Sequence, residues 1–169
     1  MCMTDYVSLK YEIEAYFETE SNPLIVLANS AAVLNEYLDD INWVGFYLAN
    51  NAKEILTLGP FQGKVACTRI EKGKGVCGTA WLTEQVQRVD NVHEFDGHIA
   101  CDSQSQSEIV LPLMIETSSG VKCIGVLDID SPSLARFAIE DEKRLTEIAE
   151  VICIALSRTK IENLLSILD

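Results

Sequence analysis

The sequence lacks most of the features that mark a disordered, membrane-bound or secreted chain. Only 4 of its 169 residues are proline and it has no low-complexity tract, which argues against extended disorder. No apolar run approaches the roughly 20 residues that a transmembrane helix needs. Residues 1–5 carry neither the basic nor the apolar region of a signal peptide. We therefore expect a cytoplasmic protein that forms one domain over residues 1–169.

Basic residues are also scarce. Lys and Arg total 13 against 26 Asp and Glu, which gives a formal net charge of −13. A nucleic-acid-binding protein usually shows a basic patch, and the field of an acidic protein repels phosphate-rich ligands. The composition therefore predicts no nucleic-acid partner, and it is compatible with a cationic or zwitterionic small ligand.

The hydrophobic pattern predicts helices near both ends of the chain and strands between them. Apolar residues recur at helical spacing over residues 5–17, 24–38 and 139–167, and Ser21-Asn22-Pro23 is a start signal for the second helix. β-Branched and aromatic runs predict the strands, with Gly59-Pro60 as punctuation, at residues 41–48, 54–58, 65–70, 86–89, 109–115 and 121–129. Short hairpins without repeated crossovers are typical of an α+β domain, in which N- and C-terminal helices flank a mainly antiparallel sheet.

Three cysteines stand in turn-rich segments, namely Cys67, Cys77 and Cys101. Because cytosolic cysteines are kept reduced, such a group indicates metal binding or thiol chemistry more often than structural disulfides. A zinc site could combine these cysteines with His93 and His98. Structural zinc sites usually contain a ligand pair at C-x₂₋₄-C spacing, and the sequence has no such pair, so zinc is the weaker alternative.

Thiol redox chemistry needs one activated thiolate and a second thiol within reach. Cys101 is the best candidate nucleophile, because it lies beside His98 in the polar, aperiodic segment 90–107, whose length is typical of a functional loop. Cys77 begins a predicted short helix, whose dipole would favour a thiolate. Two further cysteines stand among Val, Ile and Leu and are interpreted as small buried hydrophobic residues, Cys123 and Cys153.

The run Gly73-Lys74-Gly75-Val76-Cys77-Gly78 matches G-x-G-x-x-G, and Glu94 lies near the offset of the acidic residue in dinucleotide-binding folds. That motif must follow the first strand of a parallel unit, whereas here it follows hairpin-like strands. The glycines are better explained by a tight turn and close packing.

Carboxylates form a second group of candidate site residues. Glu108 begins a predicted strand, while Asp128 and Asp130 end one and point to the same face. Such carboxylates could bind an ammonium group or a metal, or donate a proton if their pKa is raised, although spacing alone favours solvated strand ends. Trp43 and Tyr47 also share a face, either as ordinary core or as an aromatic wall for a small ligand.

Six segments that carry these residues occur in order along the chain: Asn42-Trp43-Val44-Gly45-Phe46-Tyr47, Leu58-Gly59-Pro60-Phe61-Gln62-Gly63-Lys64, Gly75-Val76-Cys77-Gly78, Gly97-His98-Ile99-Ala100-Cys101-Asp102, Ser107-Glu108-Ile109-Val110 and Gly125-Val126-Leu127-Asp128-Ile129-Asp130-Ser131. Together they resemble the free methionine-(R)-sulfoxide reductases, which are built on a GAF domain. GAF domains in general lack this set of cysteines, so the resemblance points to the reductases and not only to the fold.

The resemblance implies a thiol enzyme that reduces free L-methionine-(R)-S-oxide to L-methionine. It implies Cys101 as the nucleophile, Cys67 as the resolving cysteine that converts a sulfenic acid to a disulfide, and Cys77 in an auxiliary role. The residues that it implies for substrate binding are Trp43, Tyr47, Glu108, Asp128 and Asp130. No metal and no bound cofactor are implied, and an external dithiol such as thioredoxin would recycle the enzyme.

Two further expectations concern partners. The apolar N-terminal segment and the long C-terminal helix are compatible with a homodimer. The alternative function is a non-enzymatic GAF sensor of a small ligand or of redox state, although a sensor has no need of cysteines beside carboxylates.

Overall fold

A computed structural model of the chain describes residues 4–95, 104–117 and 120–167, and its centre is one antiparallel sheet. The strands are β1 (Trp43–Asn50), β2 (Ile55–Gly63), β3 (Arg69–Glu71), β4 (Gln87–Val89), β5 (Ser107–Thr117) and β6 (Gly120–Ser131). They lie in the order β3-β2-β1-β6-β5-β4, and every neighbouring pair is antiparallel. The α+β architecture expected from the sequence is confirmed.

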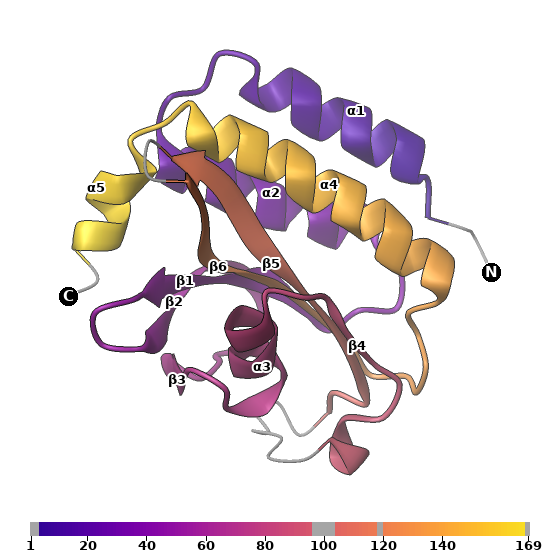
Figure 1. Ribbon diagram of the computed structural model, residues 1–169. Coiled ribbons are helices and arrows are strands. Elements are labelled where there is room, and N and C mark those ends of the chain that lie inside the picture. The colour runs from indigo at the N-terminus through magenta and orange to yellow at the C-terminus, as the bar shows by residue number, and fades with distance from the viewer. Residues whose placement is uncertain (1–3, 96–103, 118–119, 168–169) are drawn as a thin grey trace.

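Helices cover both faces of this sheet, but unequally (Figure 1). The helices α1 (Tyr6–Phe17), α2 (Pro23–Tyr37) and α4 (Ile139–Ser157) lie on one side, while the short α3 (Gly75–Thr83) lies on the other. The short α5 (Ile161–Ser166) follows α4, and a 3₁₀ turn, η1 (Val92–Glu94), follows β4. This arrangement divides the interior into a large core under three helices and a smaller core under α3.

β1 is the strand that belongs to both cores, and all eight of its residues are buried. Because side chains alternate along a strand, Val44 and Phe46 face the three-helix layer, whereas Trp43 and Tyr47 face α3. The smaller core is therefore the place where the aromatic candidate residues lie.

Local capping explains where the helices begin. The Asn22 side chain accepts a hydrogen bond from the Leu24 amide at 3.0 Å, and Pro23 occupies the first turn of α2, as its start signal predicted. At α4 the Asp141 carboxylate accepts from the Ala138 amide at 2.8 Å, and the first turn is acidic, which suits the helix dipole.

The observed elements differ from the sequence predictions in three places. The helix predicted over residues 139–167 is interrupted between α4 and α5. β2 continues through Gly59-Pro60 to Gly63, and the strand predicted at residues 65–70 is only Arg69–Glu71. The predicted loop 90–107 contains η1 and the start of β5, and its residues 96–103 lie outside the described residues.

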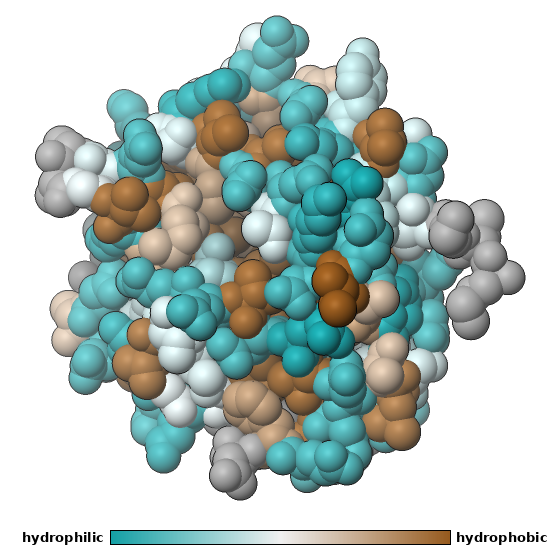
Figure 2. All heavy atoms as spheres, turned by 45° about the vertical axis from the view of Figure 1, so that its right-hand side comes forward, coloured by the Kyte–Doolittle hydropathy of each residue, from teal (hydrophilic) through white to brown (hydrophobic). Residues whose placement is uncertain are grey.

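Within the described ranges, none of the helices combines the length and the apolar character that crossing a bilayer requires. On the face seen in Figure 2, apolar side chains are interspersed with hydrophilic ones. Exposed apolar residues do gather on α1, where Val7, Tyr11 and Tyr16 are each more than half exposed.

Candidate active site

Strand register brings the predicted carboxylates together on the sheet face that α3 covers. Glu108 on β5 lies opposite Asp130 on β6, and β6 in turn pairs Asp130 with Trp43 and Asp128 with Gly45 on β1. Spacing alone favoured solvated strand ends, and that prediction was wrong for Glu108 and Asp128, which are each only 6% exposed. The reason is α3, which packs over this end of the sheet.

Cys77 joins the carboxylates from the first turn of α3. Its thiol lies 3.9 Å from Glu108 Oε1, and ligand atoms of Cys77, Glu108 and Asp128 all lie within 4.8 Å of one another. We call these three residues the buried cluster. One oxygen of Asp128, Oδ1, has no hydrogen-bond partner among the described residues, so the buried cluster retains an unused acceptor.

The glycine-rich turn explains how Cys77 reaches this position. Gly75 has φ +61°, a conformation that favours glycine, and the Gly73 amide donates to the Gly78 carbonyl at 2.9 Å. A Cβ on Gly78 would lie 2.5 Å from the Glu71 carbonyl oxygen. The tight-turn interpretation is therefore confirmed. The run follows β3 in an antiparallel sheet, so the context that dinucleotide binding requires is missing.

Burial sets the protonation of the two carboxyl groups. It raises the pKa of Asp128 to about 6 and the pKa of Glu108 well above its ordinary value. The neighbouring carboxylates of Asp128 and Asp130 raise the pKa of Glu108 further. Of these two carboxyl groups, Glu108 is therefore the one that better retains a proton near neutral pH.

The environment of Cys77 corrects one expectation from the sequence. A helix N-terminus favours a thiolate, but burial, followed by the charges of Asp128 and Glu108, raises the pKa of the Cys77 thiol well above its ordinary value. Cys77 is only 4% exposed. It is therefore a protonated thiol rather than an activated nucleophile.

The buried cluster could accept a cation in two forms. The spacing of its donors would allow a metal ion to touch all three residues. Metal binding, however, would require Cys77 to lose a proton that burial holds on it. An ammonium group needs no such loss, because it donates hydrogen bonds to carboxylate oxygens as they stand. The chemistry of the donor set thus fits an amine better than a metal.

Aromatic rings form the wall beside this cluster. Trp43 stacks on Tyr47 with ring centroids 5.9 Å apart, and on Phe61 at 5.3 Å. Phe61 was not predicted as a site residue, because Gly59-Pro60 indicated a turn rather than a strand. A Cβ on Gly45, the register partner of Phe61, would lie 2.3 Å from Phe61 Cβ and 2.7 Å from the Trp43 ring, so this stack requires glycine there.

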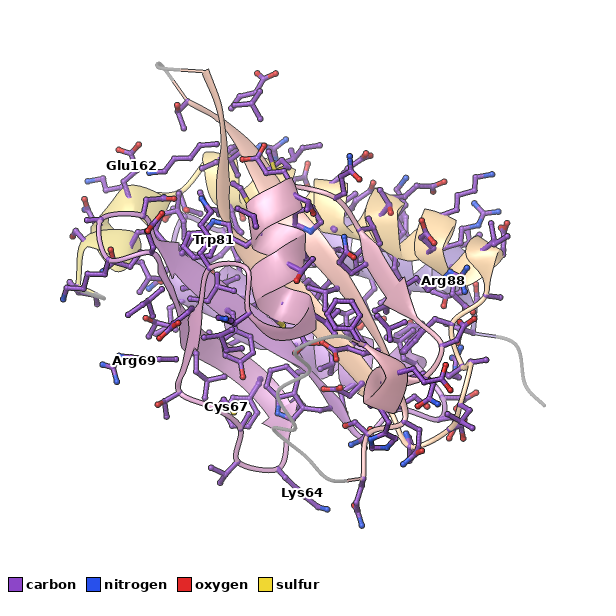
Figure 3. The ribbon with its side chains drawn as sticks, turned by 60° about the horizontal axis from the view of Figure 1, so that its bottom comes forward. Lys64, Cys67, Arg69, Trp81, Arg88 and Glu162 are labelled. Carbon is purple, nitrogen blue, oxygen red and sulfur yellow. The ribbon has the colours of Figure 1, made fainter. Side chains whose placement is uncertain are left out.

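Cys67 lies on the segment 64–68, between β2 and β3, at the rim of the same core (Figure 3). It is disulfide-bonded, whereas Cys77, Cys123 and Cys153 are free. A cysteine in a disulfide is no metal ligand, so the zinc alternative that used Cys67 does not fit this structure. Cys101 and His98 lie outside the described residues.

The remaining free cysteines behave as the sequence predicted. Cys123 is 4% exposed and Cys153 is 7% exposed, and burial raises the pKa of both thiols, that of Cys153 to about 12. Neither belongs to the buried cluster.

Two contacts that the sequence did not predict tie residues 104 and 105 to this region. The Lys64 ammonium donates to Gln104 Oε1, and Asn42 Nδ2 donates to Ser105 Oγ at 3.1 Å. No sequence pattern links residues so far apart along the chain. These two contacts place residues 104 and 105 directly beside Asn42 and beside the segment that carries Cys67.

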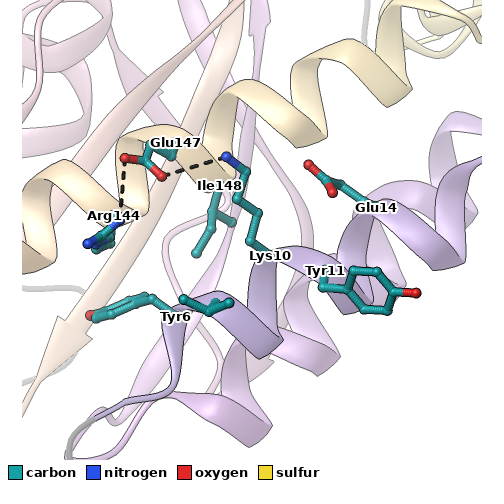
Figure 4. A pocket seen from close by; sticks show the side chains of 8 residues that line it. Tyr6, Lys10, Tyr11, Glu14, Arg144, Glu147 and Ile148 are labelled. Carbon is teal, nitrogen blue, oxygen red and sulfur yellow. Dashed lines mark ion pairs between the residues drawn. The ribbon is translucent and has the colours of Figure 1, made fainter.

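A separate hollow of about 340 Å³ lies between α1 and α4, on the other side of the sheet (Figure 4). Glu147 there pairs with Lys10 at 3.6 Å and with Arg144 at 3.7 Å. Since these charges satisfy one another and none belongs to the buried cluster, this hollow is not the candidate site.

Comparison with known proteins agrees with the geometry. The GAF domain model matches residues 22–156. The free methionine-R-sulfoxide reductase of Escherichia coli (strain K12) is 52% identical over 143 residues, which cover 85% of this chain and 83% of that protein.

Two solved structures are similar as well. The free methionine-R-sulfoxide reductase of Neisseria meningitidis, in complex with its substrate, is 42% identical with a TM-score of 0.83, covering 90% of this chain and 89% of that one. The fRMsr of Staphylococcus aureus, also in complex with substrate, is 46% identical with a TM-score of 0.83, covering 92% and 98%.

Proposed function

Since the chain belongs to the GAF domain family and is close to its free methionine-R-sulfoxide reductases, we propose that it reduces free L-methionine-(R)-S-oxide to L-methionine. The observation that carries the proposal is the buried cluster of Cys77, Glu108 and Asp128 beside stacked aromatic rings, at the rim of which Cys67 is disulfide-bonded. The carboxyl groups of the buried cluster suit the ammonium group and the polar S=O bond of this substrate, and the aromatic rings suit its methyl group.

The proposed reaction begins at Cys101. Its thiolate attacks the sulfoxide sulfur and the S=O oxygen takes up one proton. The bond between oxygen and the substrate sulfur then breaks, methionine leaves, and the oxygen stays on Cys101 as the hydroxyl of a sulfenic acid. The sulfur of Cys67 then attacks the sulfenic sulfur, so that an S–S bond forms, the S–O bond breaks and water departs. The sum is one sulfoxide and two thiols converted to methionine, one disulfide and water.

Glu108 is the proposed proton donor to the sulfoxide oxygen. Its position in the buried cluster, 3.9 Å from the protonated Cys77, and the burial that raises its pKa support a group that keeps its proton near neutral pH. Asp128, whose pKa is raised only to about 6, is then the carboxylate that carries charge toward the substrate ammonium, with Asp130 beside it.

The remaining site residues assist the reaction, and an external reductant completes the cycle. Trp43 and Tyr47 form the wall for the S-methyl group, and Cys77 assists as a neutral neighbour of Glu108. An external dithiol such as thioredoxin returns the disulfide to two thiols. The enzyme acts in the cytoplasm, without a metal or bound cofactor, as one domain spanning residues 1–169 and as a homodimer.

A coupled assay tests the function. Purified protein, thioredoxin, thioredoxin reductase and NADPH are mixed with free methionine-R-sulfoxide, and NADPH oxidation is followed together with methionine release. We expect equal amounts of NADPH oxidised and methionine formed. Binding of the sulfoxide without any methionine release, with either thioredoxin or dithiothreitol as reductant, would contradict the enzyme and favour a GAF sensor.

A further inference from the structure

Both polar atoms of the aromatic wall are directed at the segment that carries Cys67. The Tyr47 hydroxyl donates a hydrogen bond to the backbone carbonyl of Cys67 at 3.0 Å, and the Trp43 indole N–H donates to the carbonyl of Lys64 at 3.1 Å. The two aromatic residues are 1% and 3% exposed. A buried hydroxyl needs a partner, and here the partner is the cysteine's own peptide group.

The segment 64–68 has little other regular structure to fix it. β2 ends at Gly63 and β3 begins at Arg69, so the sheet ladder does not continue through these residues. Val65 is 89% exposed, and a backbone hydrogen bond from the Leu58 amide to the Thr68 carbonyl, at 3.0 Å, fixes the far end of the segment. The bonds from Trp43 and Tyr47 therefore attach the exposed turn to a strand that is buried throughout.

The oxidation state of Cys67 relates the hydrogen bond from Tyr47 to the step that forms the disulfide. Cys67 is disulfide-bonded in this structure, so the Tyr47 bond is present while Cys67 is oxidised. Burial raises the pKa of the Tyr47 phenol, and the charge of Asp128 raises it further, so the hydroxyl remains a donor at every pH at which the protein would work.

We infer that Tyr47 is a positioning residue for disulfide formation: its hydroxyl holds the Cys67 peptide so that the Cys67 sulfur reaches the sulfenic acid. The inference rests on the proposed function and adds to it. The ring of Tyr47 serves the substrate, whereas its hydroxyl serves the resolving cysteine. The step itself joins the Cys67 sulfur to the sulfenic sulfur and releases the sulfenic oxygen as water, with the thiol of Cys67 supplying the proton.

Tyr47→Phe separates the two roles, because it removes the hydroxyl and keeps the ring. Reduced protein receives one equivalent of free methionine-R-sulfoxide, and quenched samples are analysed both for methionine and for free thiols. Methionine release accompanies loss of the first thiol, and disulfide formation removes the second. We expect the rate of second-thiol loss, divided by the rate of methionine release, to fall roughly tenfold relative to wild type, the size expected when one buried hydrogen bond is lost. Dimedone should trap the accumulated sulfenic acid.

Two further variants serve as controls for this measurement. Tyr11→Phe changes a tyrosine on α1 that is 72% exposed and should alter neither rate. Tyr47→4-aminophenylalanine retains an N–H donor and should restore the wild-type rate of second-thiol loss. If Tyr47→Phe does not fold, as judged by circular dichroism, this second variant still tests the inference, because slow second-thiol loss in it would overturn the role of the donor.

The outcomes separate this inference from the proposed function. Wild-type second-thiol loss in Tyr47→Phe, or an equal decrease of both rates, would show that the hydroxyl does not act on Cys67. Absence of methionine release from the wild-type protein would instead refute the reductase itself.

Discussion

Burial makes Glu108 a carboxyl group that stays protonated at a pH at which an exposed glutamate would be ionised. Its pKa lies well above its ordinary value because of burial and because the carboxylates of Asp128 and Asp130 lie close to it. The folded state therefore holds a proton that the unfolded state releases near pH 4.5. The stability that this proton provides is complete below pH 4.5 and is lost as the pH rises through the raised pKa of the folded state.

Glu108→Gln should therefore lose activity and gain relative stability at high pH. A glutamine has no proton to donate, so we expect kcat to fall about 10²- to 10⁴-fold. The melting temperature of the variant minus that of the wild type should increase from pH 5 to pH 8, because only the wild type must deprotonate a buried carboxyl. Glu116→Gln, an exposed change on the same strand, is the control and should follow the wild-type profile. A constant temperature difference would contradict a raised pKa at Glu108.

Substitution of the two proposed redox cysteines should block turnover at different steps. Cys101→Ser should abolish turnover, since a hydroxyl is a far weaker nucleophile than a thiolate. Cys67→Ser should release about one methionine per protein molecule and then stop, because nothing resolves the sulfenic acid. Rapid-quench measurement of methionine distinguishes them. Sustained thioredoxin-dependent turnover by Cys101→Ser would remove it from the mechanism.

At the scale of elements, α3 determines the burial of the site, and Gly78 determines the position of α3. A Cβ at this residue would lie 2.5 Å from the Glu71 carbonyl, which is backbone and cannot rotate away. Gly78→Ala should therefore lower the free energy of unfolding by about 1–3 kcal/mol, measured by urea denaturation. Thr83→Ala, on the exposed end of the same helix, should change it by less than about 0.5 kcal/mol. Equal stability of Gly78→Ala and the wild type would show that the helix adjusts freely.

The helices and strands were largely predictable, because their apolar residues alternate or recur with the expected periods. The break between α4 and α5 was not, because the apolar positions Ile152, Leu156, Ile161 and Leu164 continue across it without Pro or Gly. At the break, the Arg158 and Thr159 amides donate to carbonyls three residues back, and the Thr159 hydroxyl also bonds the Leu156 carbonyl at 2.7 Å. These local hydrogen bonds end α4 without changing the spacing of the apolar residues, so the sequence pattern does not reveal the break.

β2 is the second case in which a local signal misled. Proline disfavours a central strand, yet the register between β1 and β2 shifts between Gly45 and Tyr47, opposite Gly59-Pro60. The irregularity accommodates the proline and aligns Phe61 with Gly45. The candidate site residues could be chosen as residue types in motifs, but the burial of Glu108 and Asp128 depends on the packing of α3, which residue spacing does not reveal.

For the whole molecule, the charge distribution predicts substrate scope. The net charge is −13 and the proposed site adds buried carboxylates, so a substrate with a free ammonium group should be preferred. Blocking that group should cost about 2–5 kcal/mol, on the order of 30- to 5,000-fold in kcat/KM. Free and N-acetylated methionine-R-sulfoxide are compared in the coupled assay, with methionine-S-sulfoxide as the control for stereochemistry. Comparable rates on the free and acetylated compounds would refute the role of the carboxylates.

The pairing of β1 with β6 has a consequence for biosynthesis. On a ribosome, β1 and the segments bearing Cys67 and Cys77 emerge well before β5 and β6, which supply Glu108, Asp128 and Asp130. A nascent chain therefore carries Cys77 without the strands that bury it, and the central position of the sheet next to β1 stays vacant until synthesis is nearly finished. Oxidative damage to this thiol should thus fall mainly on newly made protein, and the completed fold protects it from then on.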